Sequence, residues 1–455
     1  MSFPRYPKYK PSGVEWLGEV PEHWEVKRIR YVAELNPSKS EVRDLDRNTS
    51  VSFLAMESIG EDGSLSLDTE KMISDVESGY TYFRDGDVTI AKITPCYENG
   101  KGAVMRGLVN RIGFGTTELI VARPKPDQVT GAYLHYLFIS PDFRNLGESH
   151  MYGAGGQKRV PDSFVRNFVT AFPSPTEQTR IAAFLHTETA KIDELVAEQR
   201  RLMELLKEKR QAVISHAVTK GLNPKAPMKN SGVEWLGDVP GDWEVMRIKH
   251  LARSIEQGWS PQCEGYPAEA EDEWGVLKVG CVNGGLFNSS ENKLLPPELK
   301  PIPRLAIYRG DLLISRANTR ELVGSAAVVE QDYPTLMLCD KLYRICFNPD
   351  TCCPWFISRY LGSTAVRGQI ELCATGASPS MVNIPQSAIL ELVIAIPAYH
   401  EQLKIIASLD TDLSKLDALT AEAQRTIDLL QERRSALISA AVTGQIDVRC
   451  TVVSS

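Results

Sequence analysis

The chain has 455 residues, of which 43% are hydrophobic and 24% charged, and a formal net charge of −7 at pH 7. This length exceeds that of an ordinary single domain, so two domains with separate cores are expected. Short apolar runs and a polar, basic N-terminal segment argue against a membrane span and a secretory signal and predict a cytoplasmic protein. The negative net charge argues against a nucleic-acid-binding protein that is basic throughout, but it is compatible with a local basic groove.

The first predicted element is a segment that the chain repeats. SGVEWLGEVPEHWEV at residues 12–26 returns as SGVEWLGDVPGDWEV at residues 231–245, with differences at only three positions. The pattern predicts a turn followed by a short strand in each copy. Two interpretations of its tryptophans stay open, since paired tryptophans usually anchor a packed substructure but also suit a partner-docking surface. The four residues are Trp16, Trp24, Trp235 and Trp243.

A more divergent segment follows each repeated segment. Its strand-like stretches are separated by Gly, Pro and Asn turns, and one helical stretch lies toward its end. We therefore predict an α+β domain in each half. The strand-like stretches are residues 88–93, 118–124, 311–317, 325–330 and 341–347, and the helical stretches are residues 131–146 and 354–370.

Two polar loops in each divergent segment are candidates for DNA contact. One follows a predicted strand and the other follows the helical stretch. Their side chains suit hydrogen bonds to base edges or phosphates, although ordinary surface solvation remains an equal alternative for any single residue. In the first half they are Lys92, Thr94, Asn99, Lys101, Gln157, Lys158 and Arg159. In the second half they are Arg316, Asn318, Thr319, Arg320, Ser378, Ser380 and Asn383.

A long helix is predicted after each divergent segment. Residues 176–218 contain no proline or glycine and consist mainly of strong helix formers. Steps of three and four residues predict a coiled-coil seam, and glycines at Gly221 and Gly444 favour a left-handed turn after each helix. Two such helices can pair with each other; packing of each on its own domain is the alternative. The predicted seam residues are Ile192, Leu195, Leu202, Leu206 and Val213, then Leu416, Leu419, Leu430 and Leu437.

The motifs of several enzyme classes are missing from the sequence. It has no phosphate-binding GxxxxGK[ST] loop, no glycine-rich dinucleotide fingerprint and no Asn-Pro-Pro-aromatic tetrapeptide. The nine cysteines form no CxxC pair, and the seven histidines show no metal-ligand spacing. We therefore expect no catalytic residues, no metal and no cofactor bound to this chain.

Several of these segments resemble one known family. The repeated SGVEWLG segment, GDVTIAKITPCYENGKGAV at residues 86–104, GTTELIVARP at residues 115–124 and the Glu-Gln pair opening each long helix resemble elements of the DNA-specificity subunits of type I restriction-modification systems. The resemblance covers essentially the whole chain. The second half departs from it with GDLLISRANTRELVGSAAVV at residues 310–329, which implies a different half-site.

The resemblance implies a fold and a set of partners. The implied fold is α+β, with two target recognition domains separated by two long antiparallel coiled-coil helices in a pseudo-twofold repeat. The implied partners are double-stranded DNA, two methyltransferase subunits that bring S-adenosylmethionine, and two restriction subunits that bring ATP and Mg²⁺. The expected boundaries are residues 1–172 and 223–395 for the recognition domains, 173–222 and 396–447 for the helices, and 448–455 for a tail.

The function implied by the resemblance is non-catalytic recognition of a bipartite, asymmetric DNA target for the enzymatic subunits. Two rival functions remain at this point. One is a stand-alone duplicated DNA-binding or interaction protein without enzyme partners. The other is an enzyme whose nuclease or methyltransferase site the sequence does not reveal.

Overall fold

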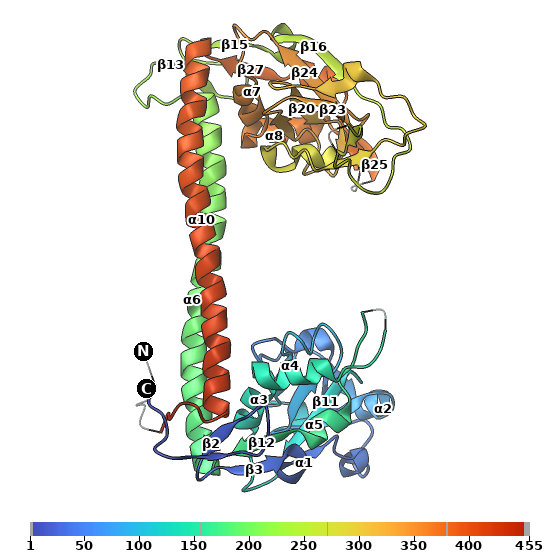
Figure 1. The fold of residues 1–455 in the computed structure, drawn as a ribbon, viewed down its shortest axis with the longest axis vertical. Helices are drawn as coiled ribbons and strands as arrows, with labels where there is room; N and C mark the ends of the chain where they lie inside the picture. Colours follow the sequence, from blue (N-terminus) through green and yellow to red (C-terminus); the bar gives the residue numbers. More distant parts are fainter. Residues whose placement is uncertain (1–2, 155, 271, 379–380, 450–455) are drawn as a thin grey trace. The chain divides into compact units, whose positions relative to one another are not determined.

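The computed structural model describes residues 3–154, 156–270, 272–378 and 381–449 (Figure 1). They belong to two compact units, one formed by residues 1–200 and 424–455 and the other by residues 201–423. The long helices α6 (Pro175–Lys220) and α10 (Tyr399–Val442) each contribute to both units. Among the described residues, no helix is long and apolar enough to cross a membrane.

The first unit contains two four-stranded sheets. Their strand orders are β6-β5-β10-β7 and β4-β11-β8-β9, and every pairing is antiparallel except that of β10 with β5. Two-stranded pairs β1-β2 and β12-β3 complete the β-structure. The strands are β1 (Tyr9–Pro11), β2 (Glu19–Pro21), β3 (Glu25–Arg28), β4 (Ala33–Leu35), β5 (Ser50–Leu54), β6 (Glu70–Met72), β7 (Thr81–Arg84), β8 (Val88–Ala91), β9 (Gly102–Val104), β10 (Ile112–Gly115), β11 (Leu119–Pro124) and β12 (Val169–Phe172).

The helices of the first unit lie mainly after its sheets in the sequence. The longer ones, α3 (Gly131–Ile139) and α4 (Pro141–Ser149), pack their buried aromatic side chains into the core that also contains Trp24. The shorter ones are α1 (Ile29–Val32), α2 (Ile73–Val76), α5 (Asp162–Asn167) and the 3-10 turns η1 (Lys39–Val42), η2 (Met56–Ser58) and η3 (Val109–Arg111).

The second unit also contains two four-stranded sheets, ordered β16-β24-β20-β22 and β18-β17-β23-β19, and a three-stranded sheet, β21-β26-β25. The strands are β13 (Met228–Asn230), β14 (Asp238–Pro240), β15 (Glu244–Arg247), β16 (Ala252–Gln257), β17 (Gly275–Leu277), β18 (Asn292–Leu294), β19 (Ala306–Ile307), β20 (Leu312–Ser315), β21 (Ala317–Asn318), β22 (Ala326–Val328), β23 (Tyr333–Met337), β24 (Leu342–Phe347), β25 (Thr375–Ser378), β26 (Met381–Asn383) and β27 (Val393–Ile396). The helices besides α6 and α10 are α7 (Pro354–Leu361), α8 (Thr364–Cys373), α9 (Gln386–Glu391), η4 (Ile248–His250), η5 (Val279–Gly285) and η6 (Pro303–Leu305).

The predicted α+β class is confirmed, and one prediction of local structure is wrong. Each predicted helical stretch is two helices, α3 and α4 in the first unit and α7 and α8 in the second. In the first stretch Pro141 cannot donate a backbone hydrogen bond, and Ser140 instead caps α4 by accepting from the Phe143 N–H. In the second, α7 ends at Leu361 before Gly362.

In each unit a buried arginine on an inner strand of a four-stranded sheet is held by two carboxylates. In the first, Arg123 on β11 contacts both oxygens of Asp87 at 2.7 and 2.8 Å and Glu41 at 2.6 Å. In the second, Arg344 on β24 contacts Asp311 at 3.2 Å and Glu256 at 2.8 Å. Because a buried charge is stable only with charged or hydrogen-bonded partners, this arrangement fixes the position of the strand that precedes each polar loop.

The repeated tryptophans divide into two structural classes. Trp24 and Trp243 are 0% exposed, and each indole N–H donates to the first turn of a long helix, to Glu177 and Glu401, at 3.2 Å. Of the two interpretations left open by the sequence, packing holds for these two side chains, because they are fully buried inside the protein. Trp16 and Trp235 are half-buried.

The long helices pair through a seam that the sequence predicted only in part. Within each unit α6 and α10 lie side by side (Figure 1), and the ion pair Asp193–Arg434 in the first unit and the ion pair Arg210–Asp417 in the second run between them. The pairing is antiparallel, because the start of α6 meets the end of α10 in the first unit and the reverse holds in the second.

Three of the nine predicted seam residues lie one position away from the real seam. Ile192, Leu206 and Leu416 are buried and Val213, Leu430 and Leu437 are half-buried, as predicted. Leu195, Leu202 and Leu419 are instead 45%, 41% and 53% exposed, since Val196, Met203 and Thr420 face inward at those turns. The pattern of a four-residue step followed by a three-residue step was assigned in the reverse order, which rotates every second position outward.

Both helices end where the glycines predicted. Gly221 and Gly444 have φ values of 75°, in the left-handed region where a side chain is disfavoured. A Cβ at Gly444 would lie 2.5 Å from Pro21, so the end of α10 also packs tightly on the first repeated segment.

Candidate nucleic-acid interface

In the first unit the structure brings the two predicted polar loops together through Thr94. The Thr94 hydroxyl donates to the Gly156 carbonyl at 2.7 Å and accepts from the Lys158 N–H at 3.0 Å. The Thr94 N–H in turn donates to the Lys158 carbonyl at 3.0 Å. Loops separated by about 60 residues in the chain therefore form one surface, and Thr94 positions that surface with its own hydrogen-bonding groups.

Three further predicted contact residues also have partners inside the unit. Arg159 forms two hydrogen bonds to Glu118, both of 2.9 Å, and Asn99 donates to Glu61 at 2.7 Å. Lys101 donates to the Met56 carbonyl at 3.3 Å. The Arg159 hydrogen bonds, followed by the charges of Arg159 and Lys92, lower the pKa of Glu118 despite the opposing effect of burial. These contacts shape the loop surface.

The remaining predicted residues of the first unit present side chains to solvent. Gln157 and Lys158 are exposed next to Gly156, whose φ is 78°, and Lys92 is half-buried. Lys92 continues the sheet, since its N–H donates to the Glu118 carbonyl and its carbonyl accepts from the Val160 N–H, both at 2.8 Å. An amide and two lysines held by one framework can bond to base edges and to phosphates, respectively.

The second unit builds the same surface with different side chains. Ala317 of β21 pairs with Asn383 of β26, and Ile93 pairs with Arg159 in the first unit. Each pair is displaced from its equivalent by 224 residues. The Arg316 carbonyl accepts from the Ile384 N–H at 2.9 Å, as the Lys92 carbonyl accepts from the Val160 N–H. The two loop pairs therefore share one backbone arrangement.

Some of the side chains on this second surface also form hydrogen bonds within the unit. Arg316 donates to the Asp340 carbonyl at 2.9 Å, and Asn318 donates to Asn283 at 3.2 Å. The Thr319 N–H donates to the Asn318 side chain at 2.9 Å, and Thr319 and Arg320 are exposed. Ser378 pairs with Met381 in the β25-β26 sheet, and Ser380 lies outside the described residues.

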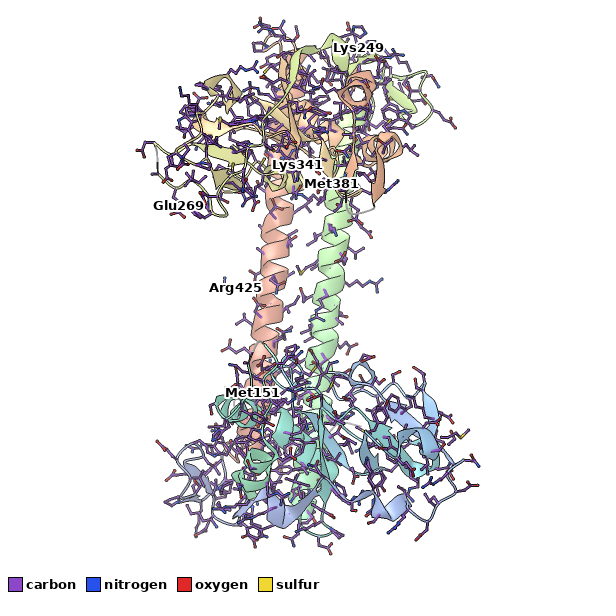
Figure 2. The ribbon with its side chains drawn as sticks, turned by 90° about the vertical axis from the view of Figure 1, so that its right-hand side faces the viewer. Met151, Lys249, Glu269, Lys341, Met381 and Arg425 are labelled. Carbon is purple, nitrogen blue, oxygen red and sulfur yellow. The ribbon has the colours of Figure 1, made fainter. Side chains whose placement is uncertain are left out.

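Sequence reasoning missed cations and an amide beside this second surface. Lys278, Lys293 and Lys341 line a cavity of about 320 Å³, and the Lys341 carbonyl accepts from the Arg316 N–H at 2.8 Å. Figure 2 labels Lys341 in this unit. Asn283 precedes Gly284 and Gly285, both at positive φ, so the Asn-Gly-Gly turn signal was available in the sequence. The lysines carry no such signal because they lie on separate strands and loops.

The described part of the chain contains no cluster of three or more His, Cys, Asp or Glu residues arranged to hold a metal ion. The loop surfaces consist instead of amides, hydroxyls, lysines and paired arginines. This set of groups suits recognition by hydrogen bonding.

Comparison with known proteins identifies relatives of this chain. No family model matches the chain. The specificity subunit of the type I restriction enzyme EcoEI from Escherichia coli is 30% identical over 93% of this chain and 83% of its own length. A putative type I restriction enzyme specificity subunit, MjaX, from Methanocaldococcus jannaschii is 22% identical over 95% of this chain and 96% of its own.

Two solved structures share the fold. A chain from a structure of a type I restriction-modification system, described in terms of its complex assembly and conformational transition, matches with a TM-score of 0.71 and 19% identity over 93% of this chain and 98% of its own. The HsdS subunit from Thermoanaerobacter tengcongensis matches with a TM-score of 0.56 and 18% identity over the same shares.

The fold and the paired loops define a duplicated protein with two equivalent polar surfaces, each tied to a shared pair of long helices. The chain belongs to the family of type I restriction enzyme specificity subunits. Its relatives recognise DNA targets and assemble with other subunits, so a stand-alone DNA-binding or interaction protein is not favoured.

Proposed function

We propose that this chain reads a bipartite, asymmetric DNA target, with one half-site contacted by each loop surface. Residues 1–172 and 223–395 are the two target recognition domains in this proposal. Gln157, Lys158 and Lys92 contact one half-site, and Asn318, Thr319, Arg320 and Asn383 contact the other. Thr94, Asn99, Lys101, Arg159 and Arg316 hold the loops in place.

One observation carries the proposal: the two loop pairs share a backbone arrangement and differ in their side chains. The Ile93–Arg159 and Ala317–Asn383 pairings are equivalent, yet Lys92, Thr94 and Arg159 correspond to Arg316, Asn318 and Asn383. A common framework with different hydrogen-bonding groups is what two readers of different sequences require, because base identity is read from the donor and acceptor pattern in the major groove.

The chemical steps are assigned to partner subunits. In this proposal two modification subunits bring S-adenosylmethionine and the adenine methyltransferase site, and two restriction subunits bring ATP, Mg²⁺, translocation and cleavage. This chain performs no catalytic step and acts in the cytoplasm. The repeated elements of the two units support assembly with two copies of one partner, since like surfaces bind like partners.

The test is an exchange of one reader. Residues 36–170 are replaced with the corresponding segment of another specificity subunit, and the methylated adenines are mapped in cells that also express the modification subunit. We expect one half-site to change while the other half-site and the spacer stay the same. Changes in both half-sites would contradict the modular assignment, and the unmodified chain is the control. Failure of the unmodified chain to direct methylation would contradict the proposed function itself.

A further inference from the structure

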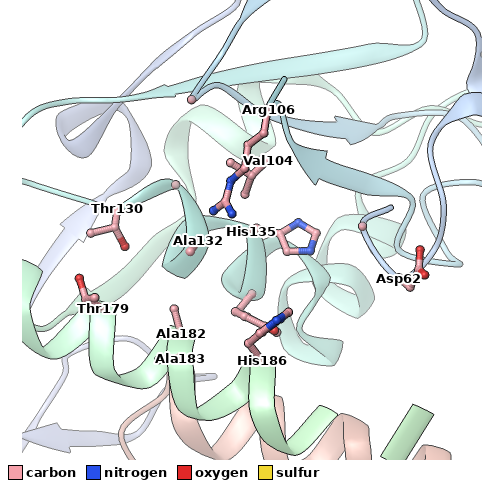
Figure 3. Close-up of a pocket in the computed structure, with 14 residues that line it drawn as sticks. Asp62, Val104, Arg106, Thr130, Ala132, His135, Thr179, Ala182, Ala183 and His186 are labelled. Carbon is pink, nitrogen blue, oxygen red and sulfur yellow. The ribbon is translucent and has the colours of Figure 1, made fainter. Parts of the chain in front are cut away.

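A cavity of about 670 Å³ lies in the first unit (Figure 3). It lies between the start of α3, the loop after β9 and the first turns of α6. Its polar lining consists of one carboxylate, one guanidinium, two hydroxyls and two imidazoles, from Asp62, Arg106, Thr130, Thr179, His135 and His186. A cavity of this size accommodates a small-molecule ligand.

One buried group in the cavity lacks a hydrogen-bond partner. His135 is only 9% exposed, and among the described residues its Nδ1 atom has no partner. Burial, reinforced by the positive charges of Arg434 and Arg106 and opposed by Asp62, lowers the pKa of His135 to about 4. The imidazole is therefore neutral at neutral pH. A buried polar atom of this kind is normally satisfied by water, an ion or a ligand.

Further hydrogen-bond donors line the same cavity, at the N-terminus of α3 and on Arg106. Gly131 and Ala132 are the first residues of α3, so the helix itself offers no acceptor for their N–H groups, and the positive end of the helix dipole points there. In Figure 3 the Arg106 guanidinium reaches toward α3 beside the His135 ring, and His186 faces the cavity from α6. A helix N-terminus combined with a guanidinium is a favourable environment for an oxyanion.

The second unit provides an internal comparison. Its register with the first is set by equivalent hydrogen bonds, because the N–H groups of Thr130 and Cys353 donate to Gln178 and Gln402, both at 2.8 Å. Likewise the N–H groups of Met105 and Val329 donate to the Asp87 and Asp311 carbonyls at 2.8 and 3.0 Å. The alignment pairs five cavity residues with their counterparts: Gly131 with Pro354, Ala132 with Trp355, Arg106 with Glu330, His135 with Ser358 and His186 with Asp410.

These differences make the second cavity less suited to an anion. Pro354 has no N–H group, Trp355 adds a large side chain, and Glu330 and Asp410 replace cationic or titratable residues with carboxylates. Ser358 donates internally to the Ala326 carbonyl at 3.0 Å. The corresponding cavity is about 270 Å³ and contains Arg359 within 3.8 Å of Asp410. At these equivalent positions the second unit thus has two carboxylates where the first has an arginine and a histidine.

We propose that the cavity of the first unit is a binding site for a small ligand that carries a phosphate or carboxylate group, which Arg106, the N-terminus of α3 and His135 hold together. The described residues of the second unit form no equivalent site. The two repeats therefore differ in ligand binding as well as in their DNA-reading loops, and the proposal does not depend on which DNA sequence is read.

The test uses the full chain with ¹⁵N-labelled histidine and inorganic phosphate as the probe. Phosphate is titrated at constant ionic strength against chloride while the imidazole signals of the seven histidines are followed by NMR. His135 is assigned with the variant His135→Gln. We expect a saturable shift of the His135 signals and a rise of the His135 pKa, because a bound anion offsets the neighbouring positive charges.

Two variants reproduce the second unit, and one serves as the control. Arg106→Glu reverses the charge of an exposed residue, and Gly131→Pro removes one N–H group at the first helical position, where proline is tolerated. Each is expected to raise the dissociation constant for phosphate about tenfold or more through loss of a charge-assisted or helix-terminal hydrogen bond. Arg200→Glu, on an exposed part of α6, is expected to leave it unchanged.

A second titration with acetate distinguishes the ligand classes. Saturation by phosphate alone assigns the site to phosphate-bearing ligands, and saturation by acetate as well extends it to carboxylates. The proposal is overturned if His135 does not respond to either anion, which would leave an ordered water as its partner. It is equally overturned if Arg106→Glu, with an unchanged circular dichroism spectrum, binds phosphate as the unmodified chain does.

Discussion

The indole N–H of Trp243 donates to the Glu401 carboxylate at 3.2 Å and ties the repeated segment to the first turn of a helix 158 residues later. Trp24 and Glu177 form the same contact in the first unit. The two buried tryptophans of the repeated segments therefore join each long helix to its own unit.

Trp243→Phe is expected to reduce the free energy of unfolding by about 1–3 kcal/mol, because it removes a hydrogen bond and part of a fully buried side chain. Trp235→Phe is the matched control and should cost less, since Trp235 is only half-buried. Denaturant unfolding followed by circular dichroism measures both. Equal costs would contradict the anchoring role assigned to the buried pair.

Thr94→Val keeps the size of the side chain and removes the hydroxyl that holds Gly156 and Lys158. We expect the affinity for target DNA to fall about tenfold, as loss of two positioning hydrogen bonds predicts. Thr94→Ser should recover most of it. Binding of the assembled methyltransferase to a labelled target duplex gives the comparison, and an unaffected Thr94→Val variant would show that the loop holds its shape without this hydroxyl.

Lys158→Ala tests whether the exposed end of the loop contacts phosphate. If it does, the slope of log affinity against log salt should become shallower by about 0.9. Gln157→Ala, at the adjacent exposed position, should leave the slope unchanged and relax the base preference at one position. A salt slope that stays the same for Lys158→Ala would place this lysine outside the phosphate contacts.

The Glu118–Arg159 pair predicts a pH dependence of stability. Because the pKa of Glu118 is lowered in the folded chain, chiefly by the Arg159 hydrogen bonds, the pair stabilises the fold fully above the unfolded pKa of about 4.3. This contribution is lost as the pH falls through the lower, folded pKa. Glu118→Gln should therefore show a smaller loss of unfolding free energy between about pH 5 and pH 3 than the unmodified chain. Parallel curves in urea denaturation at each pH would contradict the assignment.

The antiparallel helix seam predicts a rule for changing the gap between half-sites. The ion pairs Asp193–Arg434 and Arg210–Asp417 place residue 200 of α6 level with residue 427 of α10. Inserting one seam-preserving heptad after Arg200 and another after Thr426 adds about 10 Å to each helix, or about three base pairs of DNA. We expect methylation mapping to show a spacer longer by about this amount with unchanged half-sites.

A heptad inserted in α6 alone is the control for that experiment. It leaves the two seams out of step, so we expect reduced stability and no defined longer spacer. Altered half-sites in the doubly extended chain would show that the helices do more than separate the two readers.

The fold class, the two long helices and their terminal glycines followed directly from composition, periodicity and repeats. The seam did so only in part, because Leu195 and Leu202 fit a three-then-four step as well as Val196 and Met203 fit a four-then-three step. Only burial against α10 distinguishes the two assignments. The internal break at Ser140-Pro141 was readable from the proline, whereas the tie between Trp24 and Glu177 joins residues 153 positions apart and leaves no local signal.

The candidate interface was predictable as a set of loops and not as a list of contacts. Thr94 and Arg159 were identified by their chemistry, but their hydrogen bonds to Lys158 and Glu118 turn them inward. The sequence did not predict Lys278 and Lys341, because they lie on separate strands and loops that only the fold brings together. Polarity locates a recognition surface, and only tertiary structure shows which of its groups are already engaged.

The attachments of each unit lie outside its variable loops. Gln178 and Gln402 accept hydrogen bonds from the chain before α3 and α7, and Trp24 and Trp243 donate hydrogen bonds to Glu177 and Glu401. Genetic recombination can therefore replace the stretch between these attachments while the contacts that join each unit to its long helix stay the same. The near-identical segments at residues 12–26 and 231–245 would give such crossovers a place to begin, so new specificities can arise in single events.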